Sequence, residues 1–517
     1  MTDDLLERGL GWLPSPEDES DWGVDALCAA AGAEPPASYH VPAPLYPVVD
    51  QGISPQCERT RALRGRPRPA KMRLWGYPSG GRALPKTTPH GAPASGANGR
   101  RESAASRVLS RLEEVAPWQE DAYRAIHQHP ELPNEEVNTA ARAASALREA
   151  GFEVHDHVGT TGVVGVLRNG EGPAVLVRAD MDALPIEEAT GLAYASSARA
   201  TDGGGQEVPV AHACGHDVHV ASLMAAARLL GGRRDAWHGT FVALFQPAEE
   251  LGTGAKEMVD AGLAKLVPKP DVALAQHVLA YPAGKVGTHA GPFLSTAASL
   301  RVTVHGRGAH GSMPQLSVDP VVLASMVVVR LQAIVSREVA PGEFAVVTVG
   351  RLAAGTKSNI IADRAVIELN IRAYDDAMRT RLIESIERVV RAECAASGSP
   401  RDPEFERYDE YPLTANDPDV TARVAAAFRE HFGDRAFEAP RQSASEDFSD
   451  IPTALGAPYT YWALGGIDAK EWERAEAGGA IAEIPANHSP RFAPVMEPTL
   501  RTGTEAIVVA ALAWLGS

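Results

Sequence analysis

Cysteine is scarce in this chain, which has only Cys28, Cys57, Cys214 and Cys394 among its 517 residues. So few thiols, placed so far apart, exclude a fold held by a disulfide framework and favour a reducing compartment. Aromatic residues make up only 6% of the chain, whereas 44% of it is hydrophobic. That hydrophobic fraction excludes disorder over the whole length, and the length is sufficient for two sizeable domains.

Positive charge and long apolar runs are also lacking. Lys and Arg number 49 against 66 Asp and Glu, which gives a formal net charge of −17. An acidic chain is poorly suited to coat nucleic acid or an anionic membrane, so we expect neither partner. No apolar run reaches the roughly 18–20 residues that span a bilayer. The N-terminal MTDDLLERGL lacks the apolar segment of a secretory signal. We therefore expect a cytoplasmic protein.

The first hundred residues differ in composition from the rest. They hold 14 of the 39 prolines, and residues 1–50 carry ten acidic side chains and one basic one. Residues 51–101 reverse this balance, with eleven basic side chains and one acidic one. Neither half has sustained hydrophobic periodicity, so we expect residues 1–105 to form a disordered, Pro-rich extension. The alternative is a basic tail that binds an acidic partner.

From about residue 106 onward, helical patterns alternate with short apolar runs. Two helices are expected in SRVLSRLEEV and WQEDAYRAIHQH, separated by Pro117. The Val-rich runs GVVGVL, AVLVRAD, FVALFQP and DVALAQHV are typical of buried strands. Such alternation predicts an α/β fold, in which helices cover a mostly parallel sheet.

The pattern changes over residues 295–405. The runs ASLRVTVHG, FAVVTVGRL and RAVIELNIRAY alternate apolar and polar residues, as half-exposed strands do. One helix is expected after the N-cap Asp319, and another from about Asp376 to Ala396. We predict a smaller α+β domain over 295–405, inserted into a larger domain made of 106–294 and 406–517.

The segment HACGHDVH carries the strongest chemical signal. Cys214 and His216 flank a glycine, which lets the backbone turn so that both side chains can face one ion. Thiolate and imidazole are good ligands for zinc-like metals. The alternative is that Cys214 is a small core residue beside an apolar helix.

Acidic and imidazole side chains follow the predicted parallel strands directly. Asp180 and Asp182 follow AVLVR, Glu249 and Glu250 follow FVALFQPA, and His277 follows DVALAQ. In open parallel sheets, ligands bind outside the carboxyl ends of the strands, so these groups are expected to gather there.

Two adjacent carboxylates repel each other unless a cation compensates one of them. One of Glu249 and Glu250 can therefore bind a metal while the other acts as a general base. A solvated loop is the alternative reading of this pair. Near the C-terminus, His488 of NHSP is a candidate for the remaining ligand.

Ten segments in order, from about residue 120 to the C-terminus, resemble one family: HQHPELPNEE, RADMDALPIEE, HACGHDVHVA, FQPAEE, GAKEMVDAGL, HGRGAHGSMP, VDP, SNIIAD, SEDF and NHSP. The chain resembles the amidohydrolase branch of the aminoacylase/carboxypeptidase metallopeptidases. That branch includes hippurate hydrolases and indoleacetyl-amino-acid hydrolases. Residues 1–105 lie outside the resemblance.

The resemblance implies a centre of two divalent metal ions, with zinc, manganese and cobalt as the candidates. The ligands it implies are Cys214, His216, Glu250, His277 and His488. Glu249 is the implied general base, and Asp180 and Asp182 are implied to orient the ligands. The inserted domain is implied to be a lid that also forms the interface of a homodimer.

Three further residues are implied to bind substrate. His310 is the implied lid histidine, which reaches the partner subunit's site and contacts the substrate carbonyl. Asn359 and Arg372 are the candidate contacts for the substrate carboxylate, which a guanidinium suits. A glycine-flanked turn residue and a surface charge are the alternatives for His310 and Arg372. Gln315 stands where the family often has histidine, which puts the substrate preference of relatives in doubt.

The expected function is metal-dependent hydrolysis of the amide bond of a small N-acyl amino acid, giving a carboxylic acid and a free amino acid. One alternative is a dipeptidase or carboxypeptidase of the same superfamily. A non-catalytic scaffold is another alternative, but such a protein has no need of Glu249. A structural zinc protein is a third, but its site usually holds four Cys or His ligands. The sequence leaves open the acyl group, the amino acid and the native metal.

Overall fold

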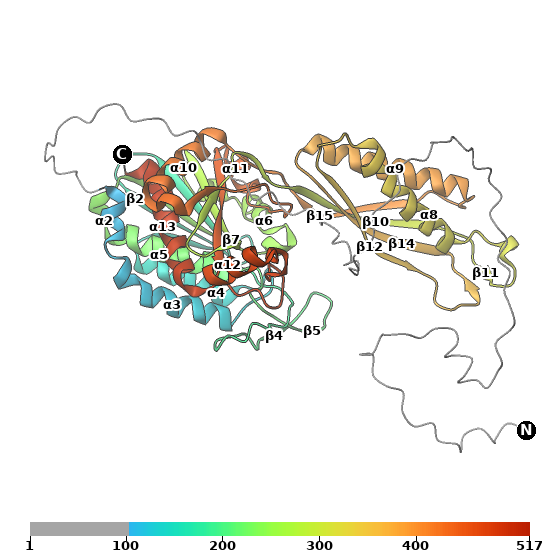
Figure 1. Cartoon of the computed structure of the whole chain (residues 1–517), viewed down its shortest axis with the longest axis horizontal. Helices are drawn as coiled ribbons and strands as arrows, with labels where there is room; N and C mark the ends of the chain where they lie inside the picture. Colours follow the sequence, from blue (N-terminus) through green and yellow to red (C-terminus); the bar gives the residue numbers. More distant parts are fainter. Residues whose placement is uncertain (1–102, 517) are drawn as a thin grey trace, which may run out of the picture. The chain divides into compact units, whose positions relative to one another are not determined.

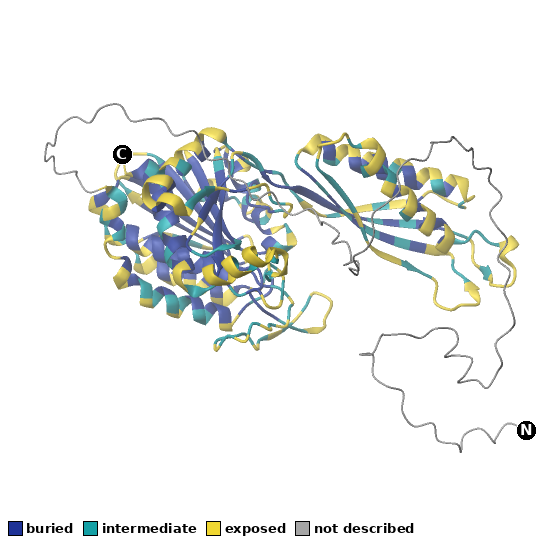
Figure 2. Ribbon diagram, viewed as in Figure 1, coloured by how far each residue is buried: buried dark blue, intermediate teal, exposed yellow. Residues whose placement is uncertain are grey.

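The computed structural model describes residues 103–516. The predicted extension 1–105 therefore lies almost entirely outside the described residues. Its basic half, residues 51–101, lies wholly outside them. Two hydrophobic clusters lie on the two faces of an eight-stranded sheet, and a third lies against a separate four-stranded sheet. Figures 1 and 2 show the two sheets with their helices, whose buried faces turn toward the strands.

The eight-stranded sheet has the order β1-β2-β6-β3-β7-β18-β8-β17. Its strands are β1 (Glu153–Val158), β2 (Gly162–Asn169), β3 (Ala174–Asp180), β6 (Gly239–Gln246), β7 (Val272–Pro282), β8 (Val286–Thr288), β17 (Ala436–Glu438) and β18 (Tyr459–Ile467). The four central strands β6, β3, β7 and β18 run parallel, as predicted. β1 and β2 run antiparallel at one edge because a short turn joins them as a hairpin.

Helices cover both faces of this sheet. One face packs against α3 (Leu112–Gln128), α4 (Val137–Glu149), α5 (His216–Gly232), α10 (Pro418–Phe432) and α13 (Met496–Leu515). The other packs against α6 (Gly254–Asp260), α7 (Leu263–Leu266) and α11 (Asp450–Leu455). The short elements α2 (Ala104–Leu109), β4 (Arg199–Thr201), β5 (Glu207–Pro209), β9 (Gly291–Leu294), β16 (Thr414–Asn416) and α12 (Ala469–Gly478) complete this part. The predicted α/β class is therefore the observed one.

The predicted break at Pro117 is wrong. Helix α3 begins at Leu112 and continues through Pro117, and the break lies earlier, at Ser110 and Arg111. A proline beyond the first turn removes one backbone hydrogen bond and costs about 3 kcal/mol, so packing must hold the helix together here. The buried side chains of α3, such as Val115 and Tyr123, hold the helix against the core on both sides of the proline.

The four-stranded sheet and its two helices, residues 296–411, are called the small module below. Its sheet has the order β12-β14-β10-β15, with all pairs antiparallel. The strands are β10 (Thr296–His305), β12 (Ala345–Ala354), β14 (Arg364–Ala373) and β15 (Glu404–Tyr411). The helices α8 (Pro320–Ala333) and α9 (Asp376–Ala396) pack against one face, and a two-stranded ribbon pairs β11 (Ala309–His310) with β13 (Ile360–Ile361).

The strict alternation of burial along β14 shows that one face of the small module's sheet is packed and the other half-exposed. This matches the alternating pattern of the sequence. The fourth strand, β15, was not predicted and carries the sheet beyond the expected boundary at residue 405.

One helical stretch among the described residues, Pro320–Glu338, is long and apolar enough to cross a membrane by length and composition alone. It contains α8, whose buried residues, Leu323, Val327 and Leu331 among them, pack in the core of the small module. A core helix of this kind passes the same test as a membrane span.

Candidate metal centre

The C-terminal ends of neighbouring parallel strands bring the predicted side chains together. Asp180, the last residue of β3, lies opposite Gln246, the last residue of β6, in the strand register. His277 lies inside β7, the neighbour of β3 on the other side, because this strand continues to Pro282 and does not end before His277 as predicted. Overlapping groups of the expected ligands have their donor atoms within 4.8 Å of one another. All five expected ligands lie in these groups: Cys214, His216, Glu250, His277 and His488.

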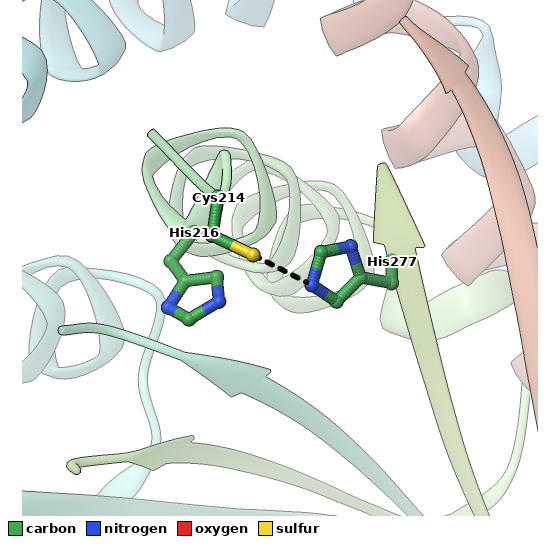
Figure 3. Close-up of side chains that lie close together, drawn as sticks. All are labelled: Cys214, His216 and His277. Atoms are coloured by element: carbon green, nitrogen blue, oxygen red, sulfur yellow. Dashed lines mark hydrogen bonds between the residues drawn. The ribbon is translucent and has the colours of Figure 1, made fainter. Parts of the chain in front are cut away.

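Cys214 and His216 stand at the start of α5, on either side of Gly215. Gly215 is the N-cap of this helix and has a φ of +84°, a conformation that favours glycine. Figure 3 shows the thiol of Cys214 directed at the ring of His277 on β7, with the ring of His216 nearby; the centroids of the two rings are 5.6 Å apart. The Sγ of Cys214 lies 3.5 Å from Nε2 of His277.

His216 presents one ring nitrogen to the centre of the site. Its Nδ1 lies 2.9 Å from the carbonyl oxygen of Asp182, which can only accept, so Nδ1 donates there. The other nitrogen, Nε2, is buried and has no hydrogen-bond partner. It lies 3.8 Å from Oε2 of Glu249 and 3.9 Å from Oε1 of Glu250. Burial opposes protonation of this ring, but the carboxylate of Asp180, 3.7 Å from Nε2, and then Cys214 raise the pKa of His216 well above its usual value. This position therefore attracts positive charge, which a metal ion bound at Nε2 can supply in place of the proton.

His277 repeats this arrangement on β7. Its Nδ1 donates to the carbonyl oxygen of Val278 at 2.8 Å, which leaves Nε2 facing Cys214. Burial, and then the neighbouring His219, lower the pKa of His277 well below its usual value. The ring is therefore neutral, the form in which imidazole binds a metal.

His488 reaches the same centre from the loop before α13. Its backbone has a φ of +70°, and its N–H donates to the carbonyl oxygen of Ala213. Its Nε2 lies 3.3 Å from Oε1 of Glu250. Contacts with Cys214 and then Glu250 raise the pKa of His488 to about 10. The raised pKa means that this position attracts positive charge, which a metal ion can supply in place of the proton.

Glu249 is a buried carboxylate in this centre, 6% exposed. Burial, and then the carboxylates of Glu446 and Glu250, raise its pKa well above the usual value. A carboxylate that takes up a proton readily is suited to be a general base.

Asp180 and Asp182 both contact ring nitrogens of this centre. Asp182 Oδ1 lies 3.1 Å from His216 Nδ1. Asp180 Oδ1 accepts from Nδ1 of His219 at 2.5 Å, because Nε2 of His219 already accepts from the backbone N–H of Val278. The ring of His219 therefore connects β3 to the residue that follows His277.

Sequence reasoning missed Arg178, which is fully buried beside this network. Its guanidinium contacts Asp180 at 2.6 Å and Glu446 at 2.7 Å. Burial opposes ionisation of Asp180, but Arg178 and the neighbouring histidines hold its pKa well below the usual range. A charged residue inside the otherwise apolar run AVLVRAD was the signal that could have found it.

The centre opens into a cavity of about 520 Å³. Arg372, from β14 of the small module, lines this cavity, so it is no free surface charge. Its Nη1 donates to the carbonyl oxygen of Ser443 at 2.9 Å and to Oγ of Ser445 at 3.1 Å. These contacts hold a guanidinium in the pocket that contains Cys214 and Glu249.

His310 and Asn359 lie elsewhere in this chain. His310 lies in the ribbon of the small module, paired with Ile360, and the carbonyl of Asn359 accepts from the N–H of Gly311. His310 lines a different cavity, of about 780 Å³, and neither residue lines the pocket that contains Glu249. The two predicted substrate contacts are therefore neighbours of each other and not of the metal centre of their own chain.

Tyr411 is a second residue that sequence reasoning missed. It ends β15 and lines the 520 Å³ cavity. Its hydroxyl donates to the carbonyl oxygen of Glu250 at 3.0 Å, and its ring lies against Gly252. The segment EFERYDEY gave no signal for this contact, which depends on how strand and turn meet in space.

Comparison with known proteins agrees with this geometry. The model of peptidase family M20/M25/M40 matches residues 176–482. The chain is 35% identical to thermostable carboxypeptidase 1 of Saccharolobus solfataricus, over 77% of this chain and 95% of that protein. It is 36% identical to the hippurate hydrolase of Campylobacter jejuni, over 65% and 82% of the two chains. A dinuclear metal-binding peptidase of the same family, from Bacillus subtilis, has a similar structure with TM-score 0.61 and 27% identity, over 77% and 98%.

The fold and the cluster of thiol, imidazole and carboxylate groups define a metal-dependent hydrolase that acts on amide bonds. The chain belongs to peptidase family M20/M25/M40, and within it to the amidohydrolase branch. The resemblance seen in the sequence is thereby confirmed.

Proposed function

We propose that this protein hydrolyses N-acyl amino acids to a carboxylic acid and a free amino acid at a pair of divalent metal ions. The observation that carries the proposal is a cluster of five candidate metal-ligand side chains, four of which line one pocket together with the carboxylate of Glu249 and the guanidinium of Arg372. The likeness to a hippurate hydrolase supports it, because hippurate is an N-acyl glycine.

The proposed metal ligands are Cys214, His216, Glu250, His277 and His488. The fit rests on the buried, unpartnered Nε2 of His216 and on Nε2 of the neutral His277, which faces the thiol of Cys214. Zinc, manganese and cobalt all suit such a set of sulfur, nitrogen and oxygen donors. A thiol among the ligands is best preserved in a reducing compartment, which supports a cytoplasmic location.

Glu249 is the proposed general base and acid. When bound, the metal ions would polarise the amide carbonyl and make the attacking water more acidic. Glu249 accepts the proton of this water and later delivers it to the leaving amine. Burial, and then the neighbouring Glu446, raise the pKa of Glu249, which makes its carboxylate a stronger base for this proton.

Arg372 is the proposed partner of the substrate carboxylate. Its guanidinium lies in the pocket with Glu249, held from behind by Ser443 and Ser445. A guanidinium binds a carboxylate through two parallel hydrogen bonds, which would orient the amino-acid half of the substrate.

We also propose that two copies of the chain form a homodimer through the small module. Eight of the exposed large hydrophobic side chains of the described residues lie between residues 313 and 360. Val322, Met326 and Val329 among them form a stripe at helical spacing along α8. An exposed apolar stripe of this kind is suited to bury against a second copy. In such a dimer His310 and Asn359 would complete the partner's site and contact the substrate there.

A dipeptidase or carboxypeptidase activity is the second candidate, favoured by the likeness to thermostable carboxypeptidase 1. A panel of N-acetyl, N-benzoyl and indoleacetyl amino acids and unblocked dipeptides separates the two. Release of free amino acid from N-acyl substrates supports the proposed function. Cleavage of the dipeptides alone would favour the second candidate.

A further inference from the structure

The turn that carries Glu249 begins in an unusual backbone conformation. Ala248, which directly precedes Glu249, has a φ of +48° although it is not glycine, and it is fully buried. A non-glycine residue in this region costs free energy and persists only where its surroundings hold it. The contacts of Ala248 therefore determine where the following side chain, that of Glu249, points.

The backbone N–H of Ala248 donates to the carboxylate of Glu136, which lies 112 residues earlier in the chain. Oε1 of Glu136 accepts from this N–H at 2.9 Å and from the N–H of Asn134 at 2.9 Å. Its Oε2 accepts from the hydroxyl of Thr161 at 2.5 Å. Glu136 is fully buried, and no cation is among its hydrogen-bond partners. Burial raises its pKa to about 7.

Glu136 belongs to the segment HQHPELPNEE, which has no step in the chemistry proposed above. Other parts of this segment also contact the chain beside the metal centre. The carbonyl oxygen of Glu131 accepts from the N–H of Ala183, and His127 lies 2.6 Å from the carboxylate of Asp217. Ala183 follows Asp182 directly, and Asp217 follows a proposed metal ligand. The segment thus contacts two loops and the first turn of α5, which carry residues of the site.

We propose that Glu136 is a positioning residue for the proposed general base. It holds the amide of Ala248 and so keeps the turn in the conformation that directs the Glu249 carboxylate into the metal centre. This inference rests on the role proposed for Glu249. Glu136 would act from outside the pocket, because it does not line the 520 Å³ cavity.

The test compares Glu136→Ala with Glu131→Ala in the metal-loaded, full-length protein. Glu131 lies in the same segment and its carboxylate accepts from the N–H groups of Asn138 and Thr139, but it has no hydrogen bond to Ala248. We expect E136A to lower kcat by about 10–100-fold, because small misplacements of catalytic groups have effects of that size. KM and metal content should stay near the wild-type values, and E131A should keep its kcat.

Two further variants separate positioning from general damage. Glu136→Gln keeps an oxygen that can accept from Ala248 and should restore most of kcat. Glu136→Asp keeps the charge but shortens the side chain, so it should lose kcat; it also serves if E136A does not fold. Loss of kcat in E136Q equal to that in E136A, or an unchanged kcat in both E136A and E136D, would overturn the proposal.

A readout independent of activity distinguishes failure of this inference from failure of the proposed function. In hydrogen exchange, the peptide that spans Ala248 should exchange faster in E136A or E136D than in wild type. In E131A the exchange rate of this peptide should equal that of wild type. Equal exchange in all variants would overturn the positioning role. If wild type turned over no N-acyl amino acid, the proposed function would fail, while the exchange result would still decide whether Glu136 holds the turn.

Discussion

At the scale of single residues, the two imidazoles of the centre share one design. His216 and His277 each donate from Nδ1 to a backbone carbonyl, and each leaves Nε2 facing Cys214 or the two glutamates. The backbone thus fixes the orientation of both rings and keeps Nδ1 as the donor, so that Nε2 is the nitrogen available to a metal. Glu249 stands apart from this set because its buried carboxylate has a raised pKa.

Glu249→Gln tests whether Glu249 is the general base while the adjacent Glu250 binds metal. The amide keeps the shape of the side chain but accepts no proton, so kcat should fall by about 10²–10⁴-fold. Metal content, measured by elemental analysis, should not change. Unchanged turnover in this variant would remove Glu249 from the role of base.

Cys214→Ala tests the thiol as a ligand. Burial, and then Glu250, raise the pKa of the Cys214 thiol in the metal-free chain, so a cation is needed to stabilise the thiolate. We expect lower metal content after dialysis against a chelator. Cys394→Ala removes the other buried thiol of the described residues and is the control that should keep full metal. Full occupancy in C214A would exclude Cys214 from the ligand set.

At the scale of elements, the turn at the start of α5 positions two of the proposed metal ligands. Gly215 adopts a φ of +84°, and a Cβ added there would lie 2.3 Å from Cγ1 of Val278. An alanine at this position would be strained by the positive φ and would clash with β7. Both effects would displace the turn that orients Cys214 and His216.

Gly215→Ala should therefore weaken metal binding and lower the free energy of unfolding by about 1–3 kcal/mol. The control is Gly262→Ala at the start of α7, where φ is +92° and a Cβ would meet only Cδ of Lys265, at 3.8 Å. The control should lose stability but keep its metal affinity. Metal titration and thermal unfolding of both variants provide the comparison, and equal metal affinity of G215A and wild type would contradict the account.

The elements also show how far the sequence alone could reach. The Val-rich runs predicted the central strands, because buried parallel strands need continuous apolar residues, and residues at their ends could be placed near one another. The break at Pro117 was predicted wrongly because local propensity ignores the packing of α3. The contacts of Tyr411 and Glu136 could not be predicted, because each joins segments more than a hundred residues apart.

At the scale of the whole molecule, the site of one chain lacks the contacts implied for the lid. Arg372 lines the pocket, but His310 and Asn359 lie at the far ribbon of the small module. A homodimer through α8 would bring these residues from a second copy. The active unit would then be the dimer, with each pocket built from two chains.

A mixture of two inactive variants tests this arrangement. Glu249→Gln lacks the base, and His310→Ala lacks the lid histidine, so each homodimer should be nearly inactive. After random subunit exchange about half of the dimers are mixed and have one intact site, so about a quarter of wild-type activity should return. Activity in the mixture no higher than the mean of the two separate variants would contradict a shared site.

We propose a metal-dependent hydrolase of N-acyl amino acids whose general base is Glu249. The most direct measurement is amino-acid release from N-acetyl and N-benzoyl substrates by chelator-treated protein, before and after adding Zn²⁺ or Mn²⁺. We predict no release from the treated protein, recovery on adding metal, and no recovery in Glu249→Gln. Release that did not depend on metal, or none with any metal bound, would contradict the account.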